Sequence, residues 1–96
     1  MKQFAIILAI ILAPAFCPAQ QTLNGSITHD GMERDYIIYI PAKYTGTSSF
    51  PLVLNFHGYG SNANHQIYYG DLRSVADTAG FLLVLPQGTL FNGITH

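Results

Sequence analysis

Glycines that follow an apolar run mark the part of this 96-residue chain best suited to chemistry. Residues 51–60 read Pro-Leu-Val-Leu-Asn-Phe-His-Gly-Tyr-Gly, so an apolar segment ends in His57-Gly58-Tyr59-Gly60. Glycine lets the backbone turn sharply and brings bare N–H groups close to a ligand. Fixed N–H dipoles aimed at developing negative charge form an oxyanion hole, which stabilises the tetrahedral intermediate of acyl transfer. The pattern indicates an oxyanion loop, although glycines that only shape a tight turn would look the same.

Nothing in the sequence supplies the nucleophile that such a loop would serve. The chain has no Gly-x-Ser-x-Gly, the turn that exposes a nucleophilic serine in α/β-hydrolases. Its serines fall in segments expected to be turn, loop or helix: Ser26, Ser48, Ser49, Ser61 and Ser74. An activated serine also needs a positioned base. We therefore assign none of them as a nucleophile, and Ser61 is expected at most to help bind substrate.

A metal or another cofactor is not expected either. Cys17 is the only cysteine, and His29, His65 and His96 lack metal-ligand spacing. Acyl transfer of the kind suggested by residues 57–60 uses only side chains and backbone dipoles.

The first nineteen residues have the three-part pattern of a secretory signal peptide. Lys2 supplies a positive charge, Phe4 to Ala13 form an unbroken apolar run, and small residues with prolines follow. A transmembrane helix needs about twenty apolar residues, and Pro14 interrupts this run too early. We expect cleavage after Ala19.

The mature chain would then be residues 20–96, secreted or otherwise extracellular or periplasmic. Cleavage after Ala15 is the alternative, and lipidation at Cys17 is disfavoured because bulky Phe16 precedes it. Either cleavage alternative leaves a chain of net charge close to zero in which Lys and Arg do not cluster. We therefore expect no nucleic-acid partner and, after removal of the signal, no membrane partner.

The rest of the chain predicts a hairpin followed by a parallel β-α-β unit. The expected elements are strands at 21–28, 34–40, 51–57 and 81–85, with one helix from near 65 to 79. His29-Asp30-Gly31 is a hairpin turn signal. Residues 51–57 and 81–85 show little alternation, which favours strands buried on both faces. The crossover between two such strands is right-handed in nearly all proteins.

The predicted helix has its own start, face and stop signals. Asp71 is a plausible N-cap, and Gly80 suits the position after the last turn. Apolar residues then recur at helical spacing on one face: Leu72, Val75, Ala76 and Ala79.

Three segments stand in a characteristic order and spacing. They are residues 31–41 (GMERDYIIYIP), 51–60 (PLVLNFHGYG) and 76–89 (ADTAGFLLVLPQGT). Together they resemble the start of secreted α/β-hydrolases of the polyhydroxybutyrate depolymerase and feruloyl esterase-like group. In that family the segments form the opening hairpin, the strand with its oxyanion loop, and the crossover helix with its following strand. The resemblance covers the chain from about Asn24 onward.

The resemblance implies roles for the residues that began this section. The backbone N–H of Tyr59 would be one donor of the oxyanion hole, with Gly60 in reserve, and His57 and Gly58 would support the loop. His57 is disfavoured as the catalytic base, because the triad histidine of these enzymes follows the serine along the chain. Tyr59, Tyr68 and Tyr69 are candidates to line a pocket for an aryl or polymer ester. Packing against helix or loop is the interpretation we favour for Tyr68 and Tyr69.

The sequence thus predicts an α/β fold: the N-terminal part of an α/β-hydrolase sheet, incomplete. The family continues with further strands, the Gly-x-Ser-x-Gly turn, an acid and a late histidine, and none of these occurs here. A fragment or truncated gene explains this better than a degenerate relative. The expected function is that of a fragment of a serine-type carboxylic-ester hydrolase, inactive by itself. The alternative is a small secreted binding module without catalysis.

Physical considerations disfavour independent folding of so short a chain. A domain of this size buries only about 60% of its chain surface, and an open sheet edge invites aggregation. We expect a poorly folded or oligomeric product when the chain is expressed alone.

Overall fold

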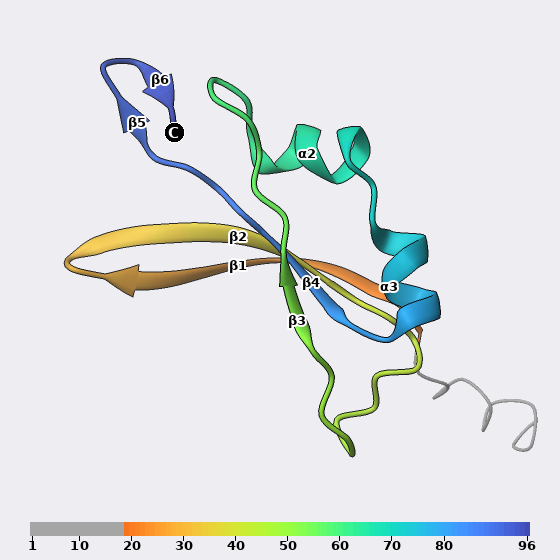
Figure 1. Ribbon diagram of the computed structural model, residues 1–96. Coiled ribbons are helices and arrows are strands. Elements are labelled where there is room, and N and C mark those ends of the chain that lie inside the picture. Colours follow the sequence, from red (N-terminus) through yellow and green to blue (C-terminus); the bar gives the residue numbers. More distant parts are fainter. Residues whose placement is uncertain (1–18) are drawn as a thin grey trace, which may run out of the picture.

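The computed structural model describes residues 19–96. The predicted signal peptide lies outside the described residues, apart from Ala19, and stays a prediction. The strands and helices follow one another in this order: β1 (Gln21–His29), β2 (Met32–Ile40), β3 (Leu52–Leu54), α2 (Ala63–Tyr69), α3 (Arg73–Ala79), β4 (Leu82–Pro86), β5 (Leu90–Phe91) and β6 (Ile94–Thr95). Figure 1 shows the long β1–β2 hairpin beside β4 and β3, with both helices on the connection between β3 and β4.

The opening hairpin forms as its turn chemistry predicts. β1 and β2 pair antiparallel from Gln21 opposite Ile40 to His29 opposite Met32. Asp30 and Gly31 both have positive φ, of 52° and 73°. Positive φ at both central residues defines the type I′ turn, whose twist matches that of the flanking strands. The predicted turn is therefore confirmed.

The four main strands form one mixed sheet in the order β1-β2-β4-β3. β2 pairs antiparallel with β4, and β3 pairs parallel with β4. Two parallel neighbours need a crossover connection, and α2 and α3 provide it. The predicted hairpin followed by one β-α-β crossover is confirmed, and this is the α/β architecture expected from the sequence.

The helical crossover differs from its prediction, because a single helix over 65–79 is wrong. α2 begins two residues earlier, where the Asn62 side chain accepts the His65 N–H at 2.8 Å. It ends at Gly70, whose carbonyl accepts a hydrogen bond from Asn55 Nδ2 at 3.0 Å. Gly70 has φ −121° and ψ 66°, which is not helical, so the chain turns there before α3 starts.

Asp71 supports the start of α3 without occupying the N-cap position, which falls on Leu72. Its carboxylate accepts the Arg73 N–H at 3.0 Å and also pairs with the Arg73 guanidinium at 2.7 Å. Hydrogen bonds from Arg73 lower the pKa of Asp71 to about 2. Gly80 ends α3 in the left-handed conformation with φ 81°, as predicted.

The core lies between one face of the sheet and the two helices. The buried apolar side chains come from β2, β4, α2 and α3: Ile37, Tyr39, Ala63, Ile67, Ala76, Leu83 and Leu85. On α3 only Ala76 is fully buried, whereas Val75 and Ala79 are exposed, so the predicted apolar face is narrower than expected. Within residues 19–96, no helix is long and apolar enough to cross a membrane.

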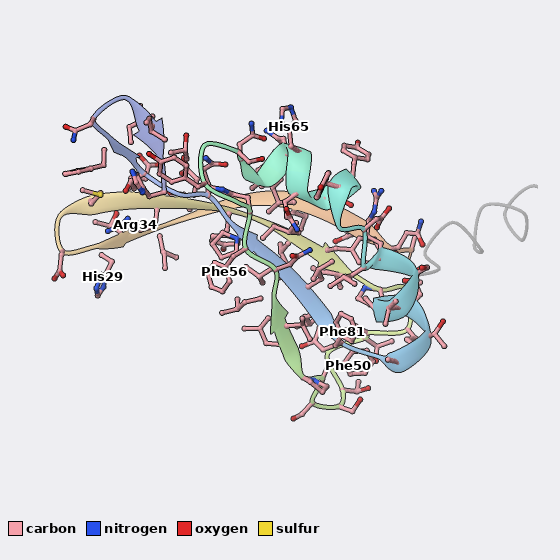
Figure 2. The ribbon with its side chains drawn as sticks, turned by 45° about the horizontal axis from the view of Figure 1, so that its top comes forward. His29, Arg34, Phe50, Phe56, His65 and Phe81 are labelled. Atoms are coloured by element: carbon pink, nitrogen blue, oxygen red, sulfur yellow. The ribbon has the colours of Figure 1, made fainter. Side chains whose placement is uncertain are left out.

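The prediction that residues 51–57 form one strand buried on both faces is wrong. The strand covers only Leu52–Leu54 and lies at the edge of the sheet. Leu52, Leu54 and Phe56 are 59%, 50% and 66% exposed. Figure 2 shows Phe56 beside the sheet. The helices cover only one face of the sheet. The hydrophobic pattern of a strand does not by itself show which of its faces other elements will cover.

A second, small hairpin was not predicted. β5 and β6 pair antiparallel around Asn92 and Gly93, whose φ values are 52° and 77°. Asn-Gly is the preferred dipeptide of the type I′ turn, so the sequence did carry a signal for it.

Candidate functional site

The candidate loop joins the end of β3 to the start of α2. The Ser61 N–H donates to the Gly58 carbonyl at 3.0 Å, which closes a four-residue turn over Gly58, Tyr59, Gly60 and Ser61. Gly60 has φ 77° at the third position of this turn. A positive φ there, after a residue of negative φ, defines a type II turn and favours glycine. Gly60 is therefore required by the turn itself, whatever the loop does.

His57 links this turn to the chain beyond β4. Its Nε2 accepts the backbone N–H of Gly88 at 2.9 Å, and its Nδ1 lies 2.8 Å from the Gly58 carbonyl oxygen. A neutral imidazole carries one donor and one acceptor nitrogen. Because Nε2 accepts a hydrogen bond from a backbone amide, the ring proton belongs on Nδ1, which then donates to the Gly58 carbonyl. The geometry therefore assigns His57 as neutral, with Nδ1–H.

The Gly58 carbonyl determines where the Tyr59 N–H points. The two groups belong to one peptide unit, which is planar and trans, so they point in opposite directions. Two donors, from His57 and Ser61, hold the carbonyl oxygen. Within residues 19–96, the Tyr59 N–H itself donates no hydrogen bond. The turn therefore presents one oriented N–H with no acceptor from the described chain.

The neighbouring amide of Gly60 is already used. It donates to the Thr95 carbonyl at 2.9 Å, which attaches the β5–β6 hairpin to the loop. The rings of Tyr59 and His96 pack edge to face, with centroids 4.9 Å apart. Sequence reasoning missed this contact because it did not predict the hairpin.

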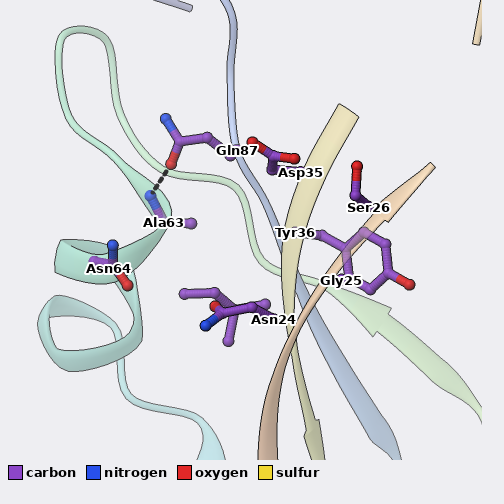
Figure 3. A pocket seen from close by; sticks show the side chains of 9 residues that line it. Asn24, Gly25, Ser26, Asp35, Tyr36, Ala63, Asn64 and Gln87 are labelled. Atoms are coloured by element: carbon purple, nitrogen blue, oxygen red, sulfur yellow. Dashed lines mark hydrogen bonds between the residues drawn. The ribbon is translucent and has the colours of Figure 1, made fainter. Parts of the chain in front are cut away.

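The far end of the loop is held by Gln87. Its Oε1 accepts the N–H of Ala63, the first residue of α2, at 2.8 Å, as the dashed line in Figure 3 shows. Its own backbone N–H donates to the Asp35 carbonyl on β2 at 2.9 Å. The sequence did not predict this contact, because the two partners lie 24 residues apart.

A hollow of about 630 Å³ opens beside the loop. Loop and α2 residues line it: Gly58, Ser61, His65, Gln66, Tyr68 and Tyr69. Tyr69 is 91% exposed, and Tyr68 is exposed with the Arg73 guanidinium 5.2 Å from its ring centroid. His65 projects outward from α2 (Figure 2). The prediction that Tyr68 and Tyr69 pack against helix or loop is therefore wrong for Tyr69. For Tyr68 it is met only by the contact between its ring and the Arg73 guanidinium.

Two further hollows lie on the sheet. One, of about 630 Å³, lies between the β1–β2 hairpin and α2 (Figure 3), and contains none of residues 57–60. The other, of about 450 Å³, lies on the uncovered face, with Leu54, Phe56 and Val84 among its lining residues. Of these three hollows, only the one beside Gly58 is lined by residues on both sides of Tyr59, namely Gly58 and Ser61, so we assign it to the site.

The remaining candidates lie apart from the loop. His29 is at the tip of the first hairpin, 3.4 Å from the Asp30 carboxylate. Within residues 19–96, no three His, Cys, Asp or Glu side chains are grouped to hold a metal ion.

Comparison with known proteins relates this architecture to esterases. No family model matches the chain. It is 32% identical over 68 residues to a bifunctional acetylxylan esterase/xylanase of Neocallimastix patriciarum, over 71% of this chain and 10% of that protein. A solved ferulic acid esterase superposes with a TM-score of 0.61 at 15% identity, over 73% of this chain and 31% of that one. An S-formylglutathione hydrolase of Staphylococcus aureus overlaps less closely, with a TM-score of 0.46 at 14% identity, over 80% of this chain and 36% of that one.

The superposition on the ferulic acid esterase shows the fold. The sheet is part of an α/β-hydrolase fold, and the chain spans about a tenth of the curated relative and about a third of the solved esterase. The chain is similar to portions of esterases in both sequence and structure.

Proposed function

We propose that this chain is the N-terminal portion of a serine-type carboxylic-ester hydrolase of the polyhydroxybutyrate depolymerase and feruloyl esterase-like group. One observation carries the proposal. The Tyr59 N–H is oriented by a held carbonyl and lacks an acceptor at the end of β3 in an α/β-hydrolase sheet. In this fold one donor of the oxyanion hole follows the nucleophile, and the other comes from the loop after the third strand.

The chemistry assigns a limited role to the residues of this chain. A serine supplied by later sequence attacks the ester carbonyl, and the carbonyl electron pair moves onto oxygen. The Tyr59 N–H donates to that oxyanion. The alcohol leaves with the proton that a histidine took from the serine, and water then releases the acid. Gly60 would serve as a second donor only after leaving Thr95, so we assign it to the turn.

The 96 residues alone are proposed to be inactive. They contain no Gly-x-Ser-x-Gly, and nucleophilic catalysis needs a serine held next to its base.

An aryl or polymer ester is the proposed substrate class. The hollow beside Gly58 is lined by Tyr68 and Tyr69 with the side chains of Ser61, His65 and Gln66, and it has no acidic, lysine or arginine lining residue. Exposed tyrosine rings offer a flat apolar surface with a polar tip, which suits a neutral ring. The names of the two similar esterases, which concern acetylxylan and ferulic acid, are consistent with this class.

Secretion completes the proposal. It is supported by the charged start, apolar run and small-residue end of residues 1–19. Comparing the N-terminus of the exported protein with that of the cytosolic precursor would test it, with Gln20 as the expected first residue.

The experiment that tests the proposed function follows the coding DNA past His96. We expect an open reading frame that encodes Gly-x-Ser-x-Gly and a later histidine, and a product that hydrolyses acetyl or feruloyl esters. The 96-residue chain, assayed in parallel, should show no turnover. A longer product without hydrolysis, or a stop codon after His96 in a chain that folds and binds a partner, would contradict the proposal in favour of the binding module.

A further inference from the structure

We propose that Gln87 and Gly88 act together as positioning residues for the Tyr59 N–H, an inference that rests on the proposed function. These two adjacent residues, called here the Gln87–Gly88 clamp, hold both ends of the loop at 57–63. Gly88 binds the first end through His57, and Gln87 binds the last end through Ala63. The Gln87–Gly88 clamp therefore determines the position of the whole loop.

The first contact acts through the tautomer of His57. The Gly88 N–H donates to Nε2 at 2.9 Å, and this places the ring proton on Nδ1. Only that tautomer donates to the Gly58 carbonyl, 2.8 Å away. With the opposite tautomer, two N–H groups would face each other at Gly88, and two acceptors would face each other at Gly58. Gly88 thereby selects the proton position that orients the peptide carrying the Tyr59 N–H.

The second contact fixes the point at which the loop becomes helix. Ala63 is buried, and its N–H is one of the first amides of α2, which have no partner within the helix. Gln87 Oε1 accepts it at 2.8 Å. Without this acceptor the buried N–H would lose its hydrogen bond, which strongly favours a shift of the chain toward water.

The clamp is itself anchored to the sheet. The Gln87 N–H donates to the Asp35 carbonyl at 2.9 Å, and Pro86 before it pairs with Tyr36 of β2. The position of the Tyr59 N–H is therefore set by β2 and β4 through the clamp, and not by the short edge strand β3 alone. This explains how a loop at an exposed edge can hold a donor in place, as catalysis requires.

The first test measures the tautomer directly in the full 96-residue chain. Nitrogen NMR of the labelled imidazole should show His57 Nδ1 protonated and Nε2 unprotonated at neutral pH. A proton on Nε2 would overturn the proposal, because Gly88 could not then donate to it. This measurement needs no substitution and no hydrolytic activity.

The second test separates positioning from general stability. In Gln87→Leu, amide exchange at Ser61, whose N–H donates to the Gly58 carbonyl, should accelerate about tenfold or more relative to the core amide of Leu83, because the loop loses one hydrogen bond to a buried group. Gln87→Glu keeps an acceptor oxygen and should restore slow exchange. Asn64→Leu is the matched control, because Asn64 and Gln87 line the same hollow between the β1–β2 hairpin and α2, and it should leave exchange at Ser61 unchanged.

Two results would overturn the inference. Equal acceleration at Leu83 and Ser61 in Gln87→Leu would show that Gln87 only stabilises the fold. Unchanged exchange at Ser61 would show that Gln87 does not hold the loop. Neither readout involves ester hydrolysis, so failure of the clamp and failure of the proposed function are distinguishable.

Discussion

His57 Nε2 accepts the backbone N–H of Gly88 at 2.9 Å, across 31 residues of sequence. The contact is possible because β3 and β4 are parallel neighbours, so the chain leaves both strands at the same edge of the sheet. A histidine after one strand thereby reaches the backbone after the next. The motif presents His57 as a possible catalytic base. Both of its ring nitrogens instead form hydrogen bonds with backbone groups.

Removing the His57 ring should loosen the loop while leaving the core in place. His57→Leu leaves the partly buried Gly88 N–H and the Gly58 carbonyl without this partner, so we expect the free energy of unfolding to fall by about 1–2 kcal/mol. Chemical denaturation measures it. His65→Leu is the control, because the exposed His65 ring takes part in no hydrogen bond within the described chain. An equal fall in the free energy of unfolding in both variants would contradict the role of His57.

A methyl group at Gly88 should displace the second hairpin. A Cβ there would collide with the backbone carbonyl of His96 and lie 3.0 Å from His57 Nε2. We expect Gly88→Ala to release the Gly60 N–H from Thr95, seen as faster amide exchange at Gly60. In Gly58→Ala the added Cβ meets no atom within 4 Å, so Gly60 should stay protected. Unaltered exchange in Gly88→Ala would show that the hairpin does not lie where the structure places it.

Alkali should destabilise the fold through Tyr39. Burial, followed by the hydrogen bond to Asp77 at 2.8 Å, raises the pKa of Tyr39 from 10.0 to about 12. A pKa raised by folding contributes stability that is complete below the unfolded value and is lost as pH rises through the folded value. We therefore expect stability to fall between pH 10 and about 12, as measured by denaturation at several pH values. Tyr39→Phe should remove that part of the pH dependence, and an unchanged slope would refute the assignment.

The uncovered sheet face should drive self-association. Leu54 is 50% exposed on the edge strand β3, next to the exposed Phe56. Exposed strand edges with apolar side chains promote pairing between chains. We expect light scattering to show oligomers of the 96-residue chain, and Leu54→Lys to reduce them. Val75→Lys, at a residue of 48% exposure on α3, is the control and should not. A monodisperse monomer with a cooperative thermal transition would contradict this expectation.

Local sequence signals predicted the parts of the fold that depend on local chemistry. Asp30-Gly31 specifies a type I′ turn because both residues tolerate positive φ, and Gly80 ends α3 for the same reason. The parallel pairing of β3 with β4 followed from the crossover pattern. The helix break was missed because it depends on Asn55, which directly follows β3 and whose side-chain amide donates to the Gly70 carbonyl. Such a partner, fifteen residues away, has no periodic signature.

The sequence predicted which residues form the candidate site, but not the hydrogen bonds that arrange them. Residues 57–60 stand out because two glycines follow an apolar run. The resemblance gave His57 a supporting role in the loop, but the sequence could not identify its partner, because that partner is the backbone amide of Gly88, 31 residues away. The expected burial of β3 failed for a related reason. A run such as Leu52–Leu54 shows that a strand can be covered, but only the neighbouring elements decide whether it is.

The most direct test concerns the backbone N–H of Tyr59 in the longer esterase proposed above. Proline is favoured at the second position of a type II turn, so Tyr59→Pro removes the donor while keeping the turn. Tyr59→Ala removes the ring and keeps the donor. We predict that kcat/KM for ester hydrolysis falls on the order of a hundredfold or more in Tyr59→Pro and far less in Tyr59→Ala. Equal activity in the two variants would contradict the assignment of Tyr59 N–H as an oxyanion donor.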